Sequence, residues 1–133
     1  MPDDESVSIA APERAMGRIL IVDDDRRMVQ LLGDCFKDAY TVDIAMNAGE
    51  ALEIVRQQRP DLVLLDVMLL GVGGIHLLRE IKRLDPTIAV IMMTGDDNDA
   101  VAAESVEHGA AAFVRKPFDL RYLDRLVTEL LDE

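Results

Sequence analysis

The chain has 133 residues, of which 50% are hydrophobic and 30% are charged, so we expect one globular domain and neither a two-domain nor a disordered chain. Its 26 Asp and Glu residues outnumber its 14 Lys and Arg residues and leave a net charge of −12. This balance argues against binding of nucleic acid or of an anionic membrane, since Lys and Arg contact phosphate groups. The single cysteine, Cys35, excludes an intrachain disulfide, and its helical apolar spacing predicts a core residue.

The N-terminal segment carries no secondary-structure signal. Residues 1–17 show neither helical nor strand periodicity, so we expect a flexible leader there and one domain over residues 18–133. The leader contains acids and no apolar run, which excludes a secretory signal. The most hydrophobic stretch, Leu62–Leu78, contains Asp66 and several glycines and is too short to span a bilayer. We therefore expect a soluble, cytoplasmic protein.

The remaining chain alternates short apolar runs with segments of helical periodicity. Runs without polar residues are typical of strands buried on both faces, whereas the run over 40–45 alternates, which predicts an edge strand. Pro60, Pro86 and Gly109 mark helix ends, and Asp119 can N-cap the last helix. In chain order we expect strand 19–22, helix 25–38, strand 40–45, helix 47–59, strand 62–65, helix 75–84, strand 88–93, helix 96–108, strand 111–114 and helix 120–130.

These strand–helix units predict an α/β fold, with a five-stranded parallel sheet and helices on both faces. The crossovers between strands are expected to be right-handed. Five units are too few for an eight-stranded barrel, so the sheet should be open. In open parallel sheets, ligands bind at the carboxyl ends of the strands.

Polar residues follow four of the predicted strands. Asp23 and Asp24 come after the first strand, Asp66 after the third, Thr94 after the fourth and Lys116 shortly after the fifth. All of these positions lie at the same carboxyl edge of a parallel sheet. We therefore expect three carboxylates, a hydroxyl and an ammonium group to gather there.

Three clustered carboxylates stay ionised together only if a cation compensates their charge. Mg²⁺ takes oxygen ligands and is often bound by carboxylates together with phosphate oxygens. A lysine can balance phosphate charge, and a hydroxyl can bind a phosphoryl oxygen. The set suits phosphoryl transfer, in which an Asp can itself be the nucleophile.

Each of these residues also has an ordinary structural interpretation. An Asp after a strand often caps the next helix, and capping explains Asp24 or Asp25 equally well. Thr94 alone is most often a turn or cap residue, and Lys116 alone is most often a solvated cation. Asp66 differs because it follows four apolar residues, where an unpartnered charge is costly. The joint placement of these residues favours the functional interpretation.

Four motifs make the sequence recognisable: Ile19–Asp25 (ILIVDDD), Pro60–Asp66 (PDLVLLD), Met92–Gly95 (MMTG) and Phe113–Phe118 (FVRKPF). In these motifs, and over roughly residues 18–131, the chain resembles the receiver domain of bacterial two-component response regulators. The resemblance implies the flavodoxin-like (βα)5 fold of chemotaxis response regulators, with strand order 2-1-3-4-5. It also implies a cis bond between Lys116 and Pro117.

The resemblance implies a role for each motif residue. Asp66 is implied as the phosphoacceptor, with Thr94 bonding the phosphoryl group and Lys116 pairing with it. Phe113 is implied as the aromatic residue that turns inward when Thr94 moves. The implied ligands of Mg²⁺ are the carboxylates of Asp23, Asp24 and Asp66 and the backbone carbonyl of Met68.

The implied partners follow from the same resemblance. A histidine kinase, a phosphotransfer protein or a small phosphodonor would supply the phosphoryl group. The face made by the fourth helix, fifth strand and fifth helix would change, and a homodimer or an output partner could use it. The resemblance also implies a phosphoacceptor domain that assists its own phosphorylation and dephosphorylation, rather than an enzyme acting on a separate substrate.

Three features depart from the family pattern. Leu70 replaces the usual proline after the phosphoacceptor, and Gly73 replaces a small polar or acidic residue, so we expect a more mobile loop and weaker metal binding. The two positions that tune phosphoryl lifetime hold Met68 and Asp96. The segment Gly109–Phe113 lacks the acid that pairs across many regulator dimers, so a dimer would need other contacts.

Two other functions are compatible with some of these residues. The Asp23-Asp24-Asp25 run contains the Asp-x-Asp of haloacid-dehalogenase-type phosphatases, in which Asp23 would be the nucleophile. The chain shows neither a later acidic pair for metal nor a cap domain, which argues against that activity. The other alternative is a receiver-like binding module that is never phosphorylated.

Overall fold

The computed structural model describes residues 17–69, 73–95 and 99–131. Five strands alternate with five helices along this part of the chain. The strands are β2 (Arg18–Val22), β3 (Thr41–Ala45), β4 (Leu62–Asp66), β5 (Ala89–Thr94) and β6 (Ala112–Arg115). The helices are α2 (Arg26–Phe36), α3 (Ala48–Gln58), α4 (Gly74–Leu84), α5 (Asp99–Glu107) and α6 (Leu120–Leu131).

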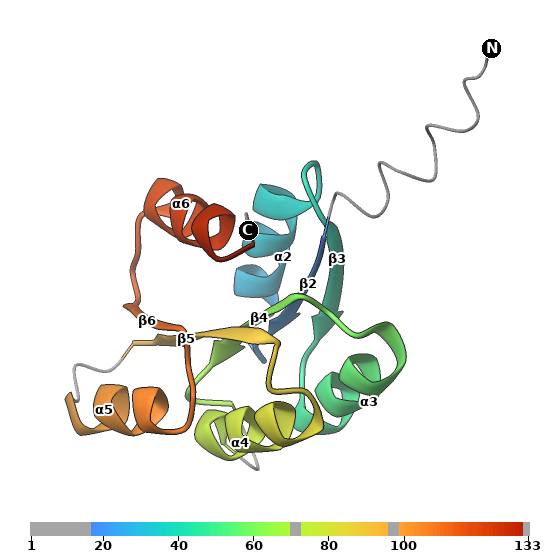
Figure 1. Cartoon of the computed structure of the whole chain (residues 1–133). Coiled ribbons are helices and arrows are strands. Elements are labelled where there is room, and N and C mark those ends of the chain that lie inside the picture. The colour runs from blue at the N-terminus through green and yellow to red at the C-terminus, as the bar shows by residue number, and fades with distance from the viewer. Residues whose placement is uncertain (1–16, 70–72, 96–98, 132–133) are drawn as a thin grey trace.

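All strand pairs are parallel, and the sheet order is β3-β2-β4-β5-β6. Numbered from the first strand, this is the predicted order 2-1-3-4-5, and the α/β architecture is confirmed. Helices α2 and α6 cover one face of the sheet, and α3, α4 and α5 cover the other (Figure 1). No helix of the described residues is both long and apolar enough to cross a membrane.

The core consists of two layers, one on each face of the sheet. In β2, Ile19 and Ile21 pack toward α2 and α6, while Leu20 and Val22 pack toward α3 and α4. Every residue of β4 is buried. An apolar run without polar gaps therefore forms the centre of the sheet because both of its faces are covered.

Strand β3 lies at one edge of the sheet, as its alternating pattern predicted. Its Ile44 side chain stays 43% exposed. Asp43, in the middle of the strand, accepts a hydrogen bond from the Arg18 guanidinium at 3.1 Å, and this pair ties β3 to β2. The strand begins at Thr41, one residue after the predicted start, because the Tyr40 N–H bonds the Phe36 carbonyl at the end of α2.

The helix ends carry the caps that the sequence predicted. Asp25 is the N-cap of α2 and accepts a hydrogen bond from the Arg27 N–H, so capping explains Asp25. Asp119 likewise accepts from the Arg121 N–H at the start of α6. Gly109 has a φ of +100°, as expected of a left-handed helix cap. Cys35 is only partly buried, and it packs against the layer that contains α2 and α6.

Some predicted segments lie partly outside the described residues. The expected leader spans residues 1–17, of which only Gly17 is described, and its carbonyl accepts a hydrogen bond from the Thr41 N–H. The helix predicted over 96–108 is described as α5 from Asp99. Leu70, Gly71 and Asp96 lie outside the described residues, and so do the predictions made on them.

Candidate metal and phosphoryl site at the carboxyl edge of the sheet

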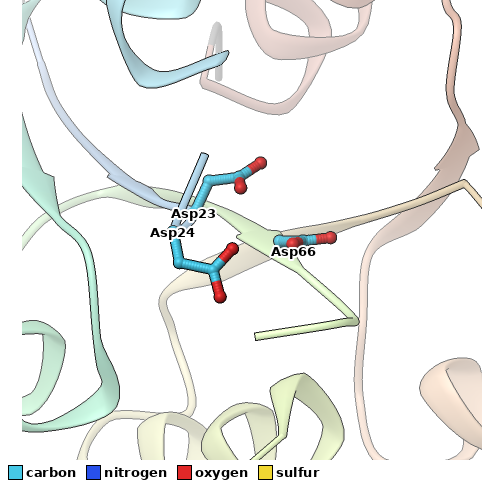
Figure 2. Close-up of side chains that lie close together, drawn as sticks. All are labelled: Asp23, Asp24 and Asp66. Carbon is cyan, nitrogen blue, oxygen red and sulfur yellow. The ribbon is translucent and has the colours of Figure 1, made fainter. Parts of the chain in front are cut away.

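Three carboxylates meet where β2 and β4 end. Asp23 directly follows β2 and Asp66 is the last residue of β4, and these two neighbouring strands run in register up to the Val22–Leu65 pair. Asp24 follows Asp23 along the chain, and Figure 2 shows all three side chains at this edge of the sheet. Each offers a carboxylate oxygen, and these three atoms lie within 4.8 Å of one another.

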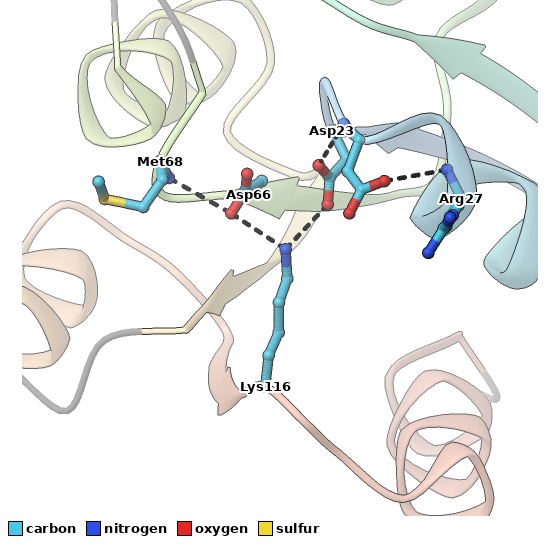
Figure 3. Close-up of polar contacts among 6 residues, drawn as sticks. Asp23, Arg27, Asp66, Met68 and Lys116 are labelled. Carbon is cyan, nitrogen blue, oxygen red and sulfur yellow. Dashed lines mark hydrogen bonds and ion pairs between the residues drawn. The ribbon is translucent and has the colours of Figure 1, made fainter.

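Lys116 joins this cluster from the end of β6. Its Nζ lies 3.0 Å from Oδ2 of Asp23 and 3.4 Å from Oδ1 of Asp66 (Figure 3). The Lys116–Pro117 peptide bond is cis, as the family resemblance implied. One ammonium group therefore contacts two carboxylates that are 93 and 50 residues away from it in the sequence.

Burial determines the electrostatics of the cluster, because Asp23 is 0% exposed and Asp66 only 5%. Burial raises the pKa of the Asp66 carboxyl above its ordinary value, and the charge of Asp23 raises it further, while Lys116 and the Met68 N–H act in the opposite direction. Burial by itself lowers the pKa of Lys116, but the hydrogen bond to Asp23 and the charges of Asp66 and Asp23 outweigh it. The pKa of Lys116 therefore lies above its ordinary value, and the ammonium stays protonated.

The donor set fits a hard divalent cation. Three carboxylates and one ammonium group leave an excess of two negative charges when all of them are ionised. Burial is the main cause of the raised pKa of Asp66, and the neighbouring Asp23 charge adds to it, so a bound cation would favour the ionised form of this carboxyl. Mg²⁺ prefers oxygen ligands and commonly binds through few carboxylates, so the residues present suit it.

Backbone N–H groups orient the two buried carboxylates. The Asp25 N–H donates to Oδ1 of Asp23 at 2.9 Å. The Met68 N–H donates to Oδ1 of Asp66 at 3.3 Å (Figure 3). Met68 itself is 64% exposed. The backbone of Met68 therefore lies at the site although most of the residue faces solvent.

The other two predicted residues lie on β5 and β6. Thr94 is the last residue of β5, it is fully buried, and it follows Met93, the strand partner of Asp66. The Thr94 carbonyl accepts a hydrogen bond from the Lys116 N–H. Phe113 is partly buried on β6 and packs against the core layer that contains α3 and α4.

One residue that supports the site was missed by sequence reasoning. A Cβ at Gly74 would lie 2.3 Å from the Asp66 carbonyl oxygen and 2.7 Å from the Val67 Cα, so only glycine fits there. The Gly74 N–H also donates to the Val67 carbonyl at 2.9 Å. In the sequence, this glycine stands out only as part of a glycine-rich loop. The close approach of α4 to the backbone after β4 gives it a packing role.

The chain matches known receiver domains over most of its length. A family model described as the response regulator receiver domain matches residues 19–128. The chain is 43% identical over 104 residues to sporulation initiation phosphotransferase F of Bacillus subtilis (strain 168), covering 77% of this chain and 84% of that protein. It is 34% identical to the transcriptional regulatory protein AfsQ1 of Streptomyces coelicolor, covering 85% of this chain and 50% of that protein.

Other relatives are much longer than this chain. The transcriptional regulatory protein ZraR of Escherichia coli (strain K12) is 38% identical, and the match covers 85% of this chain but only 26% of that protein. The chain therefore spans about half of AfsQ1 and about a quarter of ZraR.

Solved structures agree with the fold. A CheY-like response regulator receiver domain protein from Methanospirillum hungatei JF-1 superposes with a TM-score of 0.84 at 34% identity, covering 88% of this chain and 94% of that one. The BeF3-activated DrrB receiver domain superposes with a TM-score of 0.83 at 28% identity, covering 89% of this chain and 99% of that one.

Proposed function

Since this chain belongs to the response regulator receiver domain family of two-component systems, we propose that it is a phosphorylation-dependent switch with Asp66 as the phosphoacceptor. The phosphoryl donor is a histidine kinase, a phosphotransfer protein or a small phosphodonor. The observation that carries the proposal is that Asp66 pairs with Lys116 and lies close to the Asp23 and Asp24 carboxylates at one sheet edge.

The proposed transfer begins with the ionised Asp66 carboxylate. One of its oxygens bonds to phosphorus while the bond from phosphorus to the donor breaks, and the electron pair of that bond leaves with the donor group. Lys116 stays positively charged and balances the incoming phosphoryl charge. Bound Mg²⁺, held by Asp23, Asp24, Asp66 and the Met68 carbonyl, would neutralise charge on the phosphoryl oxygens.

The proposed response lies on the neighbouring strands. The Thr94 hydroxyl bonds a phosphoryl oxygen and moves toward Asp66, and Phe113 turns into the space that is freed. The face formed by α5, β6 and α6 then changes and is offered to an output partner or a second copy. Phosphorylation shifts a balance between two states rather than creating one of them. The DrrB receiver domain was solved in a form activated by BeF3, which makes beryllofluoride the natural probe here.

Radiolabelled phosphodonor tests the assignment of Asp66. With Mg²⁺ present, label is expected on the peptide that contains Asp66, and EDTA should abolish it. Asp66→Asn should lose the label while keeping the native circular dichroism spectrum, and Asp38→Asn, which changes an exposed acid, should retain it. Label on Asp23 would instead support the phosphatase chemistry described above. If no label is found and Thr94 and Phe113 do not respond to beryllofluoride, a binding module that is never phosphorylated becomes the better account.

A further inference from the structure

Arg115 makes contacts that the chemistry described above does not use. It is the last residue of β6, it pairs with Thr94 across the sheet, and it directly precedes Lys116. Because it lies two residues after Phe113 on a strand, the two side chains project from the same face. The guanidinium carbon of Arg115 lies over the Phe113 ring, 5.7 Å from its centroid. That distance is within the range of a cation–π contact.

The same guanidinium group also pairs with a carboxylate. One of its nitrogens lies 2.9 Å from Oδ1 of Asp99, in the first turn of α5. Arg115 therefore connects the ring of Phe113 on β6 with the start of α5. Strand β6 and helix α5 are two of the three elements that form the proposed output face.

We propose that Arg115, anchored on Asp99, is a positioning residue that holds the Phe113 ring in the conformation seen here. The Phe113 ring must leave the guanidinium when it turns inward. Arg115 therefore sets how large a fraction of the Asp66 sites must carry a phosphoryl group before the ring moves. This inference rests on the proposed function, because it assumes that Phe113 responds to a phosphoryl group on Asp66.

The cation–π contact and the ion pair of Arg115 differ in strength. The Asp99 side chain is 95% exposed, and exposed ion pairs contribute little stability by themselves. The cation–π contact is the stronger of the two, because Phe113 is partly buried and its ring is shielded from water on one side. Asp99 acts mainly by restricting where the guanidinium lies, so its loss should have the smaller effect.

The test follows the Phe113 ring during titration of the intact chain with beryllofluoride and Mg²⁺. The chain has three phenylalanines, so a protein with ¹³C-labelled phenylalanine rings gives few NMR signals, and Phe113→Leu assigns the relevant one. Arg115→Ala should lower the beryllofluoride concentration at the midpoint of the Phe113 shift about two- to fivefold. Arg115→Gln, which keeps part of the alkyl stem, should also lower it, and Arg115→Lys should restore part of the difference.

Two further variants separate the contacts from general surface charge. Asp99→Asn should lower the midpoint less than Arg115→Ala does. Arg121→Ala removes another exposed arginine that pairs with an aspartate, and it should leave the midpoint unchanged. If Phe113 responds in the unmodified chain and both Arg115→Ala and Arg115→Gln keep its midpoint, the positioning role is wrong and the switch still holds. If Phe113 fails to respond in the unmodified chain, the proposed function fails, and this inference fails with it.

Discussion

Helices α4 and α5 cover the same face of the sheet but differ greatly in how they are packed. Helix α4 buries Gly74, Leu77, Leu78 and Ile81. In α5 the residue that is buried is Ser105, whose hydroxyl donates to the Val101 carbonyl within the same helix. The strands beneath them show the same contrast in burial. Every residue of β4 is buried, whereas in β6 the buried residue is Val114.

This difference in packing matches the proposed division between phosphoryl transfer and conformational response. The carboxylates sit at the ends of β2 and β4, where dense packing on both faces holds their positions. Thr94 ends β5 and Phe113 lies on β6, the strand that contacts α5, whose buried residue is Ser105. Segments with little buried apolar surface open and shift at low cost in free energy. The densely packed strands β2 and β4 therefore carry the proposed phosphoacceptor site, and we expect the less buried region around β6 and α5 to rearrange more readily.

The largest expected effect comes from truncating the densely packed helix. Leu78→Ala removes a fully buried side chain from α4 and should lower the free energy of unfolding by about 2–5 kcal/mol. Val106→Ala, at a position of α5 that is 61% exposed, should change it by less than about 0.5 kcal/mol. Urea denaturation measures both values. Equal losses at the two positions would show that α5 is as firmly packed as α4.

A methyl group at Gly74 tests how closely α4 approaches the site. Gly74→Ala would place a Cβ against the backbone of Asp66 and Val67, and such overpacking should cost about 3 kcal/mol. Because the Asp66 backbone would have to shift, Mg²⁺ affinity should fall as well, which calorimetric titration measures. Gly95→Ala is the matched control for stability, since a Cβ at Gly95 would meet nothing within 4 Å. Unchanged stability of Gly74→Ala would contradict the close approach.

Removing Lys116 tests whether its ammonium group stabilises the buried carboxylates of the proposed site. Lys116→Met leaves the buried Asp23 carboxylate without its ammonium partner, so metal-free protein should lose about 1–3 kcal/mol of stability. Mg²⁺ should restore part of that loss, since the cation supplies positive charge at the same carboxylates. Thermal unfolding with and without Mg²⁺ measures both effects. If the metal-free variant were as stable as the metal-free original protein, Lys116 would not stabilise the cluster.

The smallest effect concerns pH. The pKa of Asp66 is raised above 3.8, so in metal-free protein the folded state binds this proton more tightly than the unfolded state. The resulting stabilisation is complete below 3.8 and is lost as pH rises through the raised pKa. Mg²⁺ competes with the same proton, so its affinity should decrease as pH falls through that value. Calorimetry at several pH values would show this, and Asp66→Asn should remove the part of the dependence that comes from Asp66.

The fold was predictable because its signals are local. Unbroken apolar runs such as Leu62–Leu65 occur where both faces of a strand are covered, and Asp23 and Asp66 end two such runs. Because parallel strands bring their carboxyl ends to one edge of the sheet, the sequence alone predicted that these two acids lie close together. The strand order did not follow from periodicity. It came from the resemblance, because nothing within one strand specifies its neighbours.

Other features depend on distances between segments and were not predictable. Asp24 and Asp25 were equivalent candidates for capping, and only the backbone path at the start of α2 distinguished them. The role of Gly74 requires knowing how near α4 comes to the end of β4. The contact between Arg115 and Asp99 was not predictable because the two residues lie 16 positions apart in the sequence.

The Arg18–Asp43 pair has a further consequence for how copies of this chain meet. As the outer strand of the sheet, β3 presents one row of backbone N–H and C=O groups to its surroundings, and such rows can template aggregation by intermolecular strand pairing. Asp43 places a charge in the middle of this five-residue strand, and Arg18 holds it there. A strand docking alongside would have to dehydrate that ion pair, which disfavours the growth of a continuous sheet through β3.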